Sequence, residues 1–214
     1  MKKFVITALS AVAMISSSSL MAAGNAEAGK TKAATCLACH GADGNSIAPN
    51  FPNLAAQGEA YMVKQLMDFK AGKRKDPTMN AMVMALDEQA MQDISAFYAT
   101  QPLKPGQADP KQVAAGKQIY KGGILETNIP ACMGCHGPTG SGNPGSVYPQ
   151  LSSQKSAYIE KQLKDFRNAA QNPNQETAPV GRHNDASAAM RNAVKLLNDY
   201  EIKAVAQYIQ GLQP

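Results

Sequence analysis

The sequence predicts an all-α chain built from two tandem modules of one kind. Two observations carry this prediction: the second half repeats much of the first position by position, and apolar residues in each half recur at helical spacing. We find no convincing alternation of apolar and polar residues that would indicate a β-strand. A chain of 214 residues, 44% hydrophobic and 17% charged, fits one or two small domains and excludes a large multidomain enzyme.

The first 22 residues have the pattern of an export signal. Lys2 and Lys3 precede an apolar run over residues 4–15, and small residues follow around Ala22. The run is too short to cross a bilayer, which takes about 20 helical residues. We therefore expect residues 1–22 to be removed and the mature protein to be soluble and exported.

Residues 23–100 and 111–214 are predicted to be two copies of one domain. Residues 51–54 (Phe-Pro-Asn-Leu) correspond to 148–151 (Tyr-Pro-Gln-Leu), and 64–70 correspond to 161–167. The offset is 97 residues here and 111 residues from Leu86 onward, so the second copy carries an insertion of 14 residues. The prolines and glycine of residues 101–110 predict a linker between the copies.

Each copy is expected to fold as helices around its own core. Apolar side chains recur every three or four residues in the middle of each copy, at Met62, Leu66 and Phe69 and at Ile159, Leu163 and Phe166. Asp87 and Asn198 are good N-caps and predict where the closing helices begin. Gly29 and Gly116 lie in the expected opening helices, where a missing side chain would let the first and last helices cross closely.

The four cysteines fall in two identical C-x-x-C-H frames, residues 36–40 and 132–136. Two thiols three positions apart on one turn can reach the two vinyl groups of one porphyrin, and the adjoining histidine then lies under the iron. A thioredoxin-like disulfide, or a zinc site built from both pairs, would not require that histidine. We predict two covalently bound haem c groups, attached through Cys36, Cys39, Cys132 and Cys135, with His40 and His136 as iron ligands.

The sixth iron ligand distinguishes an electron carrier from an enzyme, because an open iron position could bind a substrate. Downstream of His136 the second copy contains a single methionine, Met190. Met190 lies seven residues before Leu197, and Met79 lies seven residues before Leu86, the corresponding leucine of the first copy. This spacing singles out Met79 from the neighbouring Met82 and Met84. We predict His–Met ligation of both irons, which raises the reduction potential, and no catalytic activity.

Other residues are candidates to support the haem groups. An iron-ligating histidine needs a hydrogen-bond acceptor for its other ring nitrogen, and Pro52 and Pro149 could each present a backbone carbonyl there. Four basic residues, Lys73, Arg74, Lys75 and Arg182, could neutralise haem propionates, although plain surface charge is the slightly favoured interpretation. The formal charge of +5 is mildly basic and is compatible with an acidic partner surface, but a spread of solvated lysines is the favoured explanation, and we expect no nucleic-acid partner.

The sequence resembles the dihaem cytochrome c4 family over essentially the whole mature chain. The resemblance is carried by both C-x-x-C-H-G frames, by residues 48–54 (Ala-Pro-Asn-Phe-Pro-Asn-Leu), by Gln57-Gly58 and by residues 208–212 (Tyr-Ile-Gln-Gly-Leu). It implies two tandem class I cytochrome c domains, each wrapped around one covalent haem c and related by a pseudo-twofold axis. The motif matches carry over the four cysteines as anchors and His40, Met79, His136 and Met190 as axial ligands.

The same resemblance implies a periplasmic carrier, soluble or loosely attached to the inner membrane. Such a carrier passes electrons from a quinol-oxidising cytochrome complex to terminal oxidases or reductases. The alternative is a dihaem cytochrome subunit of a flavin-dependent sulfide dehydrogenase, which would keep fold and ligands but purify with a flavoprotein. A dihaem peroxidase needs an open or displaceable iron position, so two methionine ligands argue against it.

Overall fold

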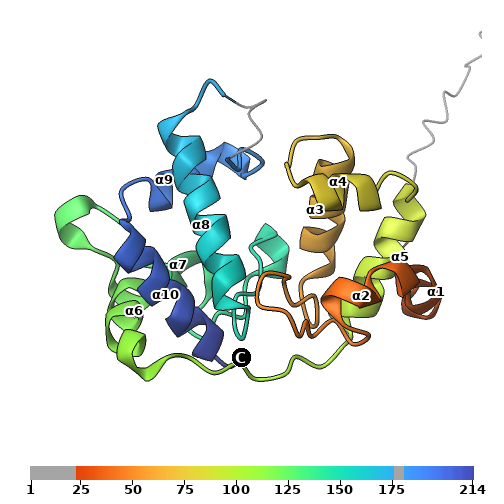
Figure 1. Cartoon of the computed structure of the whole chain (residues 1–214), viewed down its shortest axis with the longest axis horizontal. Coiled ribbons are helices and arrows are strands. Elements are labelled where there is room, and N and C mark those ends of the chain that lie inside the picture. The colour runs from red at the N-terminus through yellow and green to blue at the C-terminus, as the bar shows by residue number, and fades with distance from the viewer. Residues whose placement is uncertain (1–22, 176–180) are drawn as a thin grey trace, which may run out of the picture.

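The computed structural model describes residues 23–175 and 181–214, and these residues form helices and turns with two isolated β-bridges but no strand. Figure 1 shows two groups of helices side by side, joined along one edge by an extended segment. The predicted all-α, two-domain arrangement is therefore confirmed. The predicted export signal, residues 1–22, lies outside the described residues. Within the described ranges, no helix is both long enough and apolar enough for a membrane span.

The last helix of the first domain begins where the sequence predicted. Its helices are α1 (Ala26–Lys32), η1 (Ala33–Thr35), α2 (Leu37–His40), α3 (Glu59–Lys70), α4 (Pro77–Met82) and α5 (Glu88–Ala99). Asp87 caps α5 by accepting a hydrogen bond from the Ala90 amide. Helix α1 crosses α5 at Gly29, where a Cβ atom would lie 1.9 Å from the carbonyl oxygen of Asp93. The expected close crossing at this glycine is confirmed.

The second domain repeats this order, and its helices α6, α8 and α10 are longer than their counterparts α1, α3 and α5. Its helices are α6 (Pro110–Gly122), η2 (Leu125–Thr127), α7 (Met133–His136), η3 (Pro144–Ser146), α8 (Ser156–Gln171), η4 (Ala186–Ala188), α9 (Ala189–Val194) and α10 (Asp199–Gly211). Asn198 caps α10 and forms a reciprocal capping box with Glu201. Helix α6 crosses α10 at Gly116, where a Cβ atom would lie 2.1 Å from the carbonyl oxygen of Ala204. The second predicted crossing is also confirmed.

Helices α3 and α8 occupy equivalent places in the repeat, and they lie on the sides of the two domains that face each other (Figure 1). Each presents its buried apolar side chains to its own domain: Met62 and Phe69 from α3, and Ile159, Leu163 and Phe166 from α8. The connecting segment is held to both domains. Asn45 donates to the Pro102 carbonyl and accepts from the Lys104 amide, and Gln210 donates to the Gln107 carbonyl.

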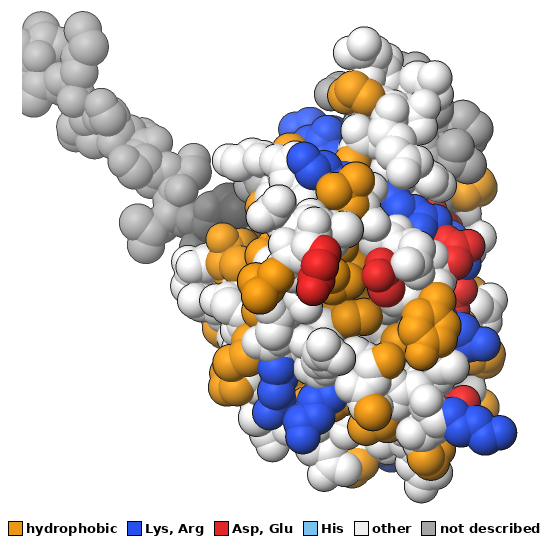
Figure 2. Space-filling view, turned by 90° about the vertical axis from the view of Figure 1, so that its left-hand side faces the viewer, with side chains coloured by type: hydrophobic (Ala, Val, Ile, Leu, Met, Phe, Trp, Pro, Cys, Tyr) orange, Lys and Arg blue, Asp and Glu red, His pale blue; other side chains and the backbone are white. Residues whose placement is uncertain are grey.

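The outer face of the second domain is shown in Figure 2. Acidic side chains lie there among basic and apolar ones, and no single charge covers the face. This mixture agrees with the expectation that the positive formal charge reflects solvated surface lysines.

Candidate haem sites

Each C-x-x-C-H frame folds as one short helix that buries its histidine. His40 ends α2 and His136 ends α7, and their side chains are only 7% and 5% exposed. The chain leaves both helices through a glycine with φ near 80°, a conformation that suits a residue without a Cβ atom. In the part of the chain that the structure describes, the cysteines form no disulfide, and no three His, Cys, Asp or Glu side chains gather into a metal-binding group.

Both buried imidazoles are oriented by the carbonyl oxygens that the sequence indicated. Nδ1–H of His40 donates to the Pro52 carbonyl at 2.9 Å, and Nδ1–H of His136 donates to the Pro149 carbonyl at 3.0 Å. A carbonyl oxygen can only accept, so the hydrogen bond fixes the tautomer and leaves Nε2 free to bind a metal. Burial lowers the pKa of both imidazoles, an effect that the carbonyl hydrogen bond opposes. The neutral, iron-binding form of each ring is thereby favoured.

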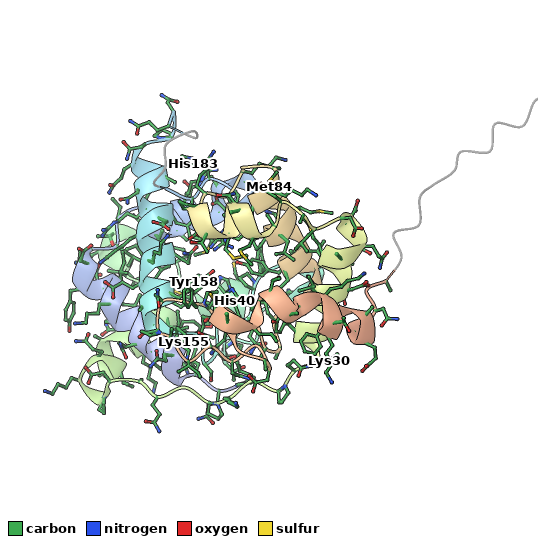
Figure 3. The ribbon with its side chains drawn as sticks, turned by 45° about the vertical axis from the view of Figure 1, so that its right-hand side comes forward. Lys30, His40, Met84, Lys155, Tyr158 and His183 are labelled. Carbon is green, nitrogen blue, oxygen red and sulfur yellow. The ribbon has the colours of Figure 1, made fainter. Side chains whose placement is uncertain are left out.

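The two predicted methionine ligands lie in corresponding short helices that sequence reasoning did not predict. Met79 lies on α4 and Met190 on α9, and both side chains are half-buried and pack against the core of their own domain. Met82 and Met84 are 42% and 61% exposed, and Figure 3 places Met84 at the edge of the molecule. Among these three methionines of the first domain, Met79 is thus the one that packs against the buried apolar cluster.

Arg74 and Arg182 are buried between the domains, so the interpretation of these two residues as surface charge is wrong. Each is only 8% exposed, and each guanidinium lies over a phenylalanine ring of its own domain, 4.5 Å from Phe69 and 4.4 Å from Phe166. The sequence could not reveal this placement, because both arginines lie in polar loops. Tyr158, one of their partners, is labelled near the centre of the molecule in Figure 3.

The two arginines form corresponding hydrogen bonds across the interface between the domains. Arg74 donates to Gln65 of its own domain and to Tyr158 and Gln162 of the other domain, at 2.8–2.9 Å. Arg182 donates in the same way to Gln162, and to Tyr61 and Gln65 across the interface, at 2.9–3.1 Å. Within the described chain, neither guanidinium forms an ion pair with a carboxylate. Burial would raise the pKa of Tyr61, but the two guanidiniums outweigh it and lower that pKa.

Two glutamines that sequence reasoning did not assign to the site join the domains close to His40 and His136. Gln57 Oε1 accepts from the Gln150 amide at 2.9 Å, and Gln154 Oε1 accepts from the Asn53 amide at 2.7 Å. Both glutamines are buried, at 7% and 6% exposure. The repeat carried a signal for them, since Gln57 and Gln154 are 97 residues apart, the offset that relates the two copies.

Comparisons with known proteins fit these two equivalent sites. The family model of cytochrome c matches residues 26–101 and again residues 113–213. The chain is 45% identical to cytochrome c4 of Azotobacter vinelandii, over 89% of this chain and 90% of that protein. The crystal structure of reduced recombinant cytochrome c4 from Pseudomonas stutzeri superposes with a TM-score of 0.82 at 44% identity, covering 89% of this chain and all of that one. The chain belongs to the cytochrome c4 family. A more distant relative, the thiosulfate dehydrogenase electron acceptor of Stutzerimonas stutzeri, is 33% identical over 84% of this chain and 80% of its own length.

Membership of the cytochrome c4 family establishes two covalently bound haem c groups and a role in electron transfer rather than catalysis. The donor atoms of the structure fit this cofactor. Each domain offers two thiols on one turn, a neutral imidazole with a free Nε2 and a half-buried thioether on a separate helix. Thiol, imidazole and thioether are the groups that anchor and ligate a c-type haem.

Proposed function

We propose that this protein is a periplasmic electron carrier that accepts electrons from a quinol-oxidising cytochrome complex and delivers them to terminal oxidases or reductases. The observation that carries the proposal is the presence of two equivalent donor sets, each with a buried histidine fixed by a proline carbonyl and a methionine held on the core. When bound, haem c supplies a one-electron iron centre, and a closed coordination sphere restricts it to electron transfer.

The residue assignment proposed here follows the repeat. Cys36 and Cys39 hold one haem and Cys132 and Cys135 the other, while His40 with Met79 and His136 with Met190 close the two iron coordination spheres. Residues 1–22 are the export signal, residues 23–100 and 111–214 are the domains, and residues 101–110 are the linker. The exposure of Met82 and Met84 supports the choice of Met79.

Arg74 and Arg182 are proposed to neutralise haem propionates at the domain interface. In the described chain each buried guanidinium is compensated by several hydrogen bonds to neutral groups but by no carboxylate, so its positive charge has no anionic partner. A propionate carboxylate on each haem would provide that partner through charge-assisted hydrogen bonds. This arrangement would also bring the propionate edges of the two haems toward one another.

The proposal is tested with the exported, haem-loaded protein. Denatured protein should have the mass of the mature chain plus two haems, and an anaerobic titration should give two one-electron steps at high potential. Stopped-flow mixing with a terminal oxidase should give rapid oxidation that slows as added salt screens the docking charges. Rapid turnover of hydrogen peroxide or nitrite by the isolated protein would overturn the assignment as a carrier.

A second candidate function is that of electron acceptor for a sulfur-oxidising dehydrogenase. The 33% identity to a thiosulfate dehydrogenase electron acceptor favours it, and the flavin-dependent sulfide dehydrogenase subunit belongs to the same class of role. The higher identity to cytochrome c4 of Azotobacter vinelandii favours the free carrier. Affinity purification from membranes, read by mass spectrometry, separates the two functions, because a subunit should bring a dehydrogenase with it and a carrier should not.

A further inference from the structure

The two peptide groups that orient the histidine ligands also reach into the opposite domain. The peptide between Pro52 and Asn53 accepts the His40 Nδ1–H through its carbonyl oxygen, and its N–H donates to Oε1 of Gln154. In the second domain, the peptide between Pro149 and Gln150 accepts from His136 and donates to Oε1 of Gln57. Each histidine is thus two hydrogen bonds away from a glutamine of the other domain.

Both glutamine side chains are held in place from two directions. The side-chain amide of Gln154 donates to the Asn53 carbonyl at 2.8 Å, and that of Gln57 donates to the Gln150 carbonyl at 3.0 Å. Each Oε1 also accepts a hydrogen bond from the backbone amide of the following residue, Lys155 for Gln154 and Gly58 for Gln57. We call each pair of hydrogen bonds, from imidazole to peptide group and from peptide group to glutamine, a relay. Because the glutamines are buried, water does not compete freely for these hydrogen bonds, and the domain interface fixes their geometry.

We propose that Gln154 and Gln57 are positioning residues that lower the reduction potential of the haem in the opposite domain. This inference rests on the proposed ligation by His40 and His136. Hydrogen bonds in a chain polarise one another, so donation by the peptide N–H makes its carbonyl oxygen a stronger acceptor for the imidazole Nδ1–H. A more strongly held Nδ1–H raises the basicity of the ligating nitrogen, which stabilises oxidised iron and lowers the potential.

The two relays differ in a way that orders their expected effects. The hydrogen bond from the Asn53 amide to Gln154 is buried and 2.7 Å long, whereas the bond from the Gln150 amide to Gln57 is partly buried and 2.9 Å long. Asn53 is further fixed through its side chain, which donates to the Ser153 carbonyl and accepts from the Ser46 amide. Gln154 should therefore affect the first-domain haem more than Gln57 affects the second-domain haem.

The test is a crossed set of variants studied as haem-loaded protein. Gln154→Leu should raise the potential of the first-domain haem by a roughly twofold to tenfold change in its reduction equilibrium, where tenfold corresponds to about 59 mV for one electron. Gln57→Leu should raise the potential of the second-domain haem by less. Spectroelectrochemical titration, with each haem assigned by proton NMR, measures both potentials in every variant. The His40 Nδ1–H resonance of the reduced protein should move in Gln154→Leu and stay in Gln57→Leu.

Gln210→Leu is the matched control, because Gln210 Oε1 also accepts a backbone amide hydrogen bond, from Ser156 at 2.7 Å, but has no link to an imidazole. It should leave both potentials unchanged. Equal shifts of both haems in either glutamine variant, or no shift, would overturn the relay. If Gln154→Leu fails to fold, Gln154→Glu keeps the acceptor and adds a negative charge, so the first-domain potential should fall; a rise would overturn the proposal.

Failure of the relay can be told from failure of the proposed ligation. If the unmodified protein lacks two haems with histidine–methionine spectra, the ligand assignment is wrong before any variant is made. If those spectra are present and the crossed pattern is not, only the relay is wrong.

Discussion

The two domains bury one large tyrosine each, but from different helices. In the first domain Tyr98 of α5 packs in a cluster with Ala33, and both are fully buried. In the second domain the corresponding positions hold Ile209 on α10 and Tyr120 on α6, so the aromatic ring has moved to the opening helix. Each tyrosine lies against the aromatic ring at one equivalent position of the closing helix: Tyr98 against Phe97, with ring centroids 5.0 Å apart, and Tyr120 against Tyr208, with ring centroids 5.5 Å apart. The large side chain has moved from the closing helix to the opening helix, and the two helices together still fill the same space.

The two domains therefore contain two kinds of position. Core side chains can differ between the copies when their combined volume is kept, and the two copies do differ at such positions. The glutamines that accept backbone amide hydrogen bonds across the interface instead keep their place in the repeat, since Gln57 and Gln154 are 97 residues apart. The comparison therefore predicts large effects at positions that the repeat keeps in both domains and unequal effects at exchanged core positions.

The largest expected effect is loss of a sixth ligand, which should break the equivalence of the two haem sites. Met190→Ala should open one of the two haems to carbon monoxide, weaken the red absorption band assigned to sulfur–iron bonding and lower one potential substantially. Met79→Ala should do the same at the other haem. Absorption spectra with and without carbon monoxide, followed by redox titration, provide the measurement.

Met82→Leu and Met84→Leu are the controls for the first domain, since both side chains are exposed and should not affect the sulfur band. If either erased the band while Met79→Leu spared it, the choice of Met79 by its place in the repeat would be wrong.

The next effect tests the feature that both domains share, the close crossing of their first and last helices. Gly29→Ala and Gly116→Ala place a Cβ atom about 2 Å from a backbone carbonyl oxygen, so each should destabilise its domain by about 1–3 kcal/mol. Gly134→Ala is the control, because no atom lies within 4 Å of its added Cβ and the first copy already has Ala38 at that place. Thermal unfolding measures all three, and an unchanged midpoint for Gly116→Ala would contradict the crossing.

Sequence reasoning succeeded where the repeat or a local rule specifies the structure. The caps Asp87 and Asn198, the glycine crossings and the carbonyls of Pro52 and Pro149 follow from spacing and hydrogen-bond needs, and the structure confirms them. It failed for the buried arginines. Arg74 lies five residues before Met79 and Arg182 eight residues before Met190, so the inserted residues hide their equivalence from a comparison of sequence alone. Their burial depends on contacts with the other domain, which no local pattern reports.

A smaller effect should distinguish the two exchanged tyrosines. The Tyr120 hydroxyl donates to the Gly137 carbonyl at 2.7 Å, just after the His136 helix, whereas the Tyr98 hydroxyl has no hydrogen-bond partner among the described residues. Tyr120→Phe should therefore cost about 1 kcal/mol, while Tyr98→Phe should be neutral or slightly stabilising. Chemical denaturation of both variants gives the comparison. A greater loss of stability in Tyr98→Phe than in Tyr120→Phe would contradict this expectation, because it would mean that the Tyr98 hydroxyl also stabilises its domain.

The smallest effect concerns an ion pair that only the first copy has at this place in the repeat. Asp93 of α5 pairs with Lys32 of α1 at 2.5 Å, and the corresponding residue of the second domain is Ala204. The Lys32 hydrogen bond, aided by the Asn25 amide and Gln89, lowers the pKa of Asp93 from 3.8 to about 2. Because the folded-state pKa is the lower one, the pair stabilises the first domain above pH 4 and loses its effect as the pH falls toward 2.

Asp93→Asn should therefore cost the first domain about 0.5 kcal/mol at neutral pH, since Lys32 remains 38% exposed and water screens the pair. The difference from the unmodified protein should shrink as the pH is lowered from 4 to 2, where the unmodified carboxyl becomes protonated. Denaturant unfolding at several pH values, followed by the absorption of each haem, measures this trend. A difference that stayed constant over that range would mean that the Asp93 carboxylate stabilises α1 through hydrogen bonding geometry alone and not through its charge.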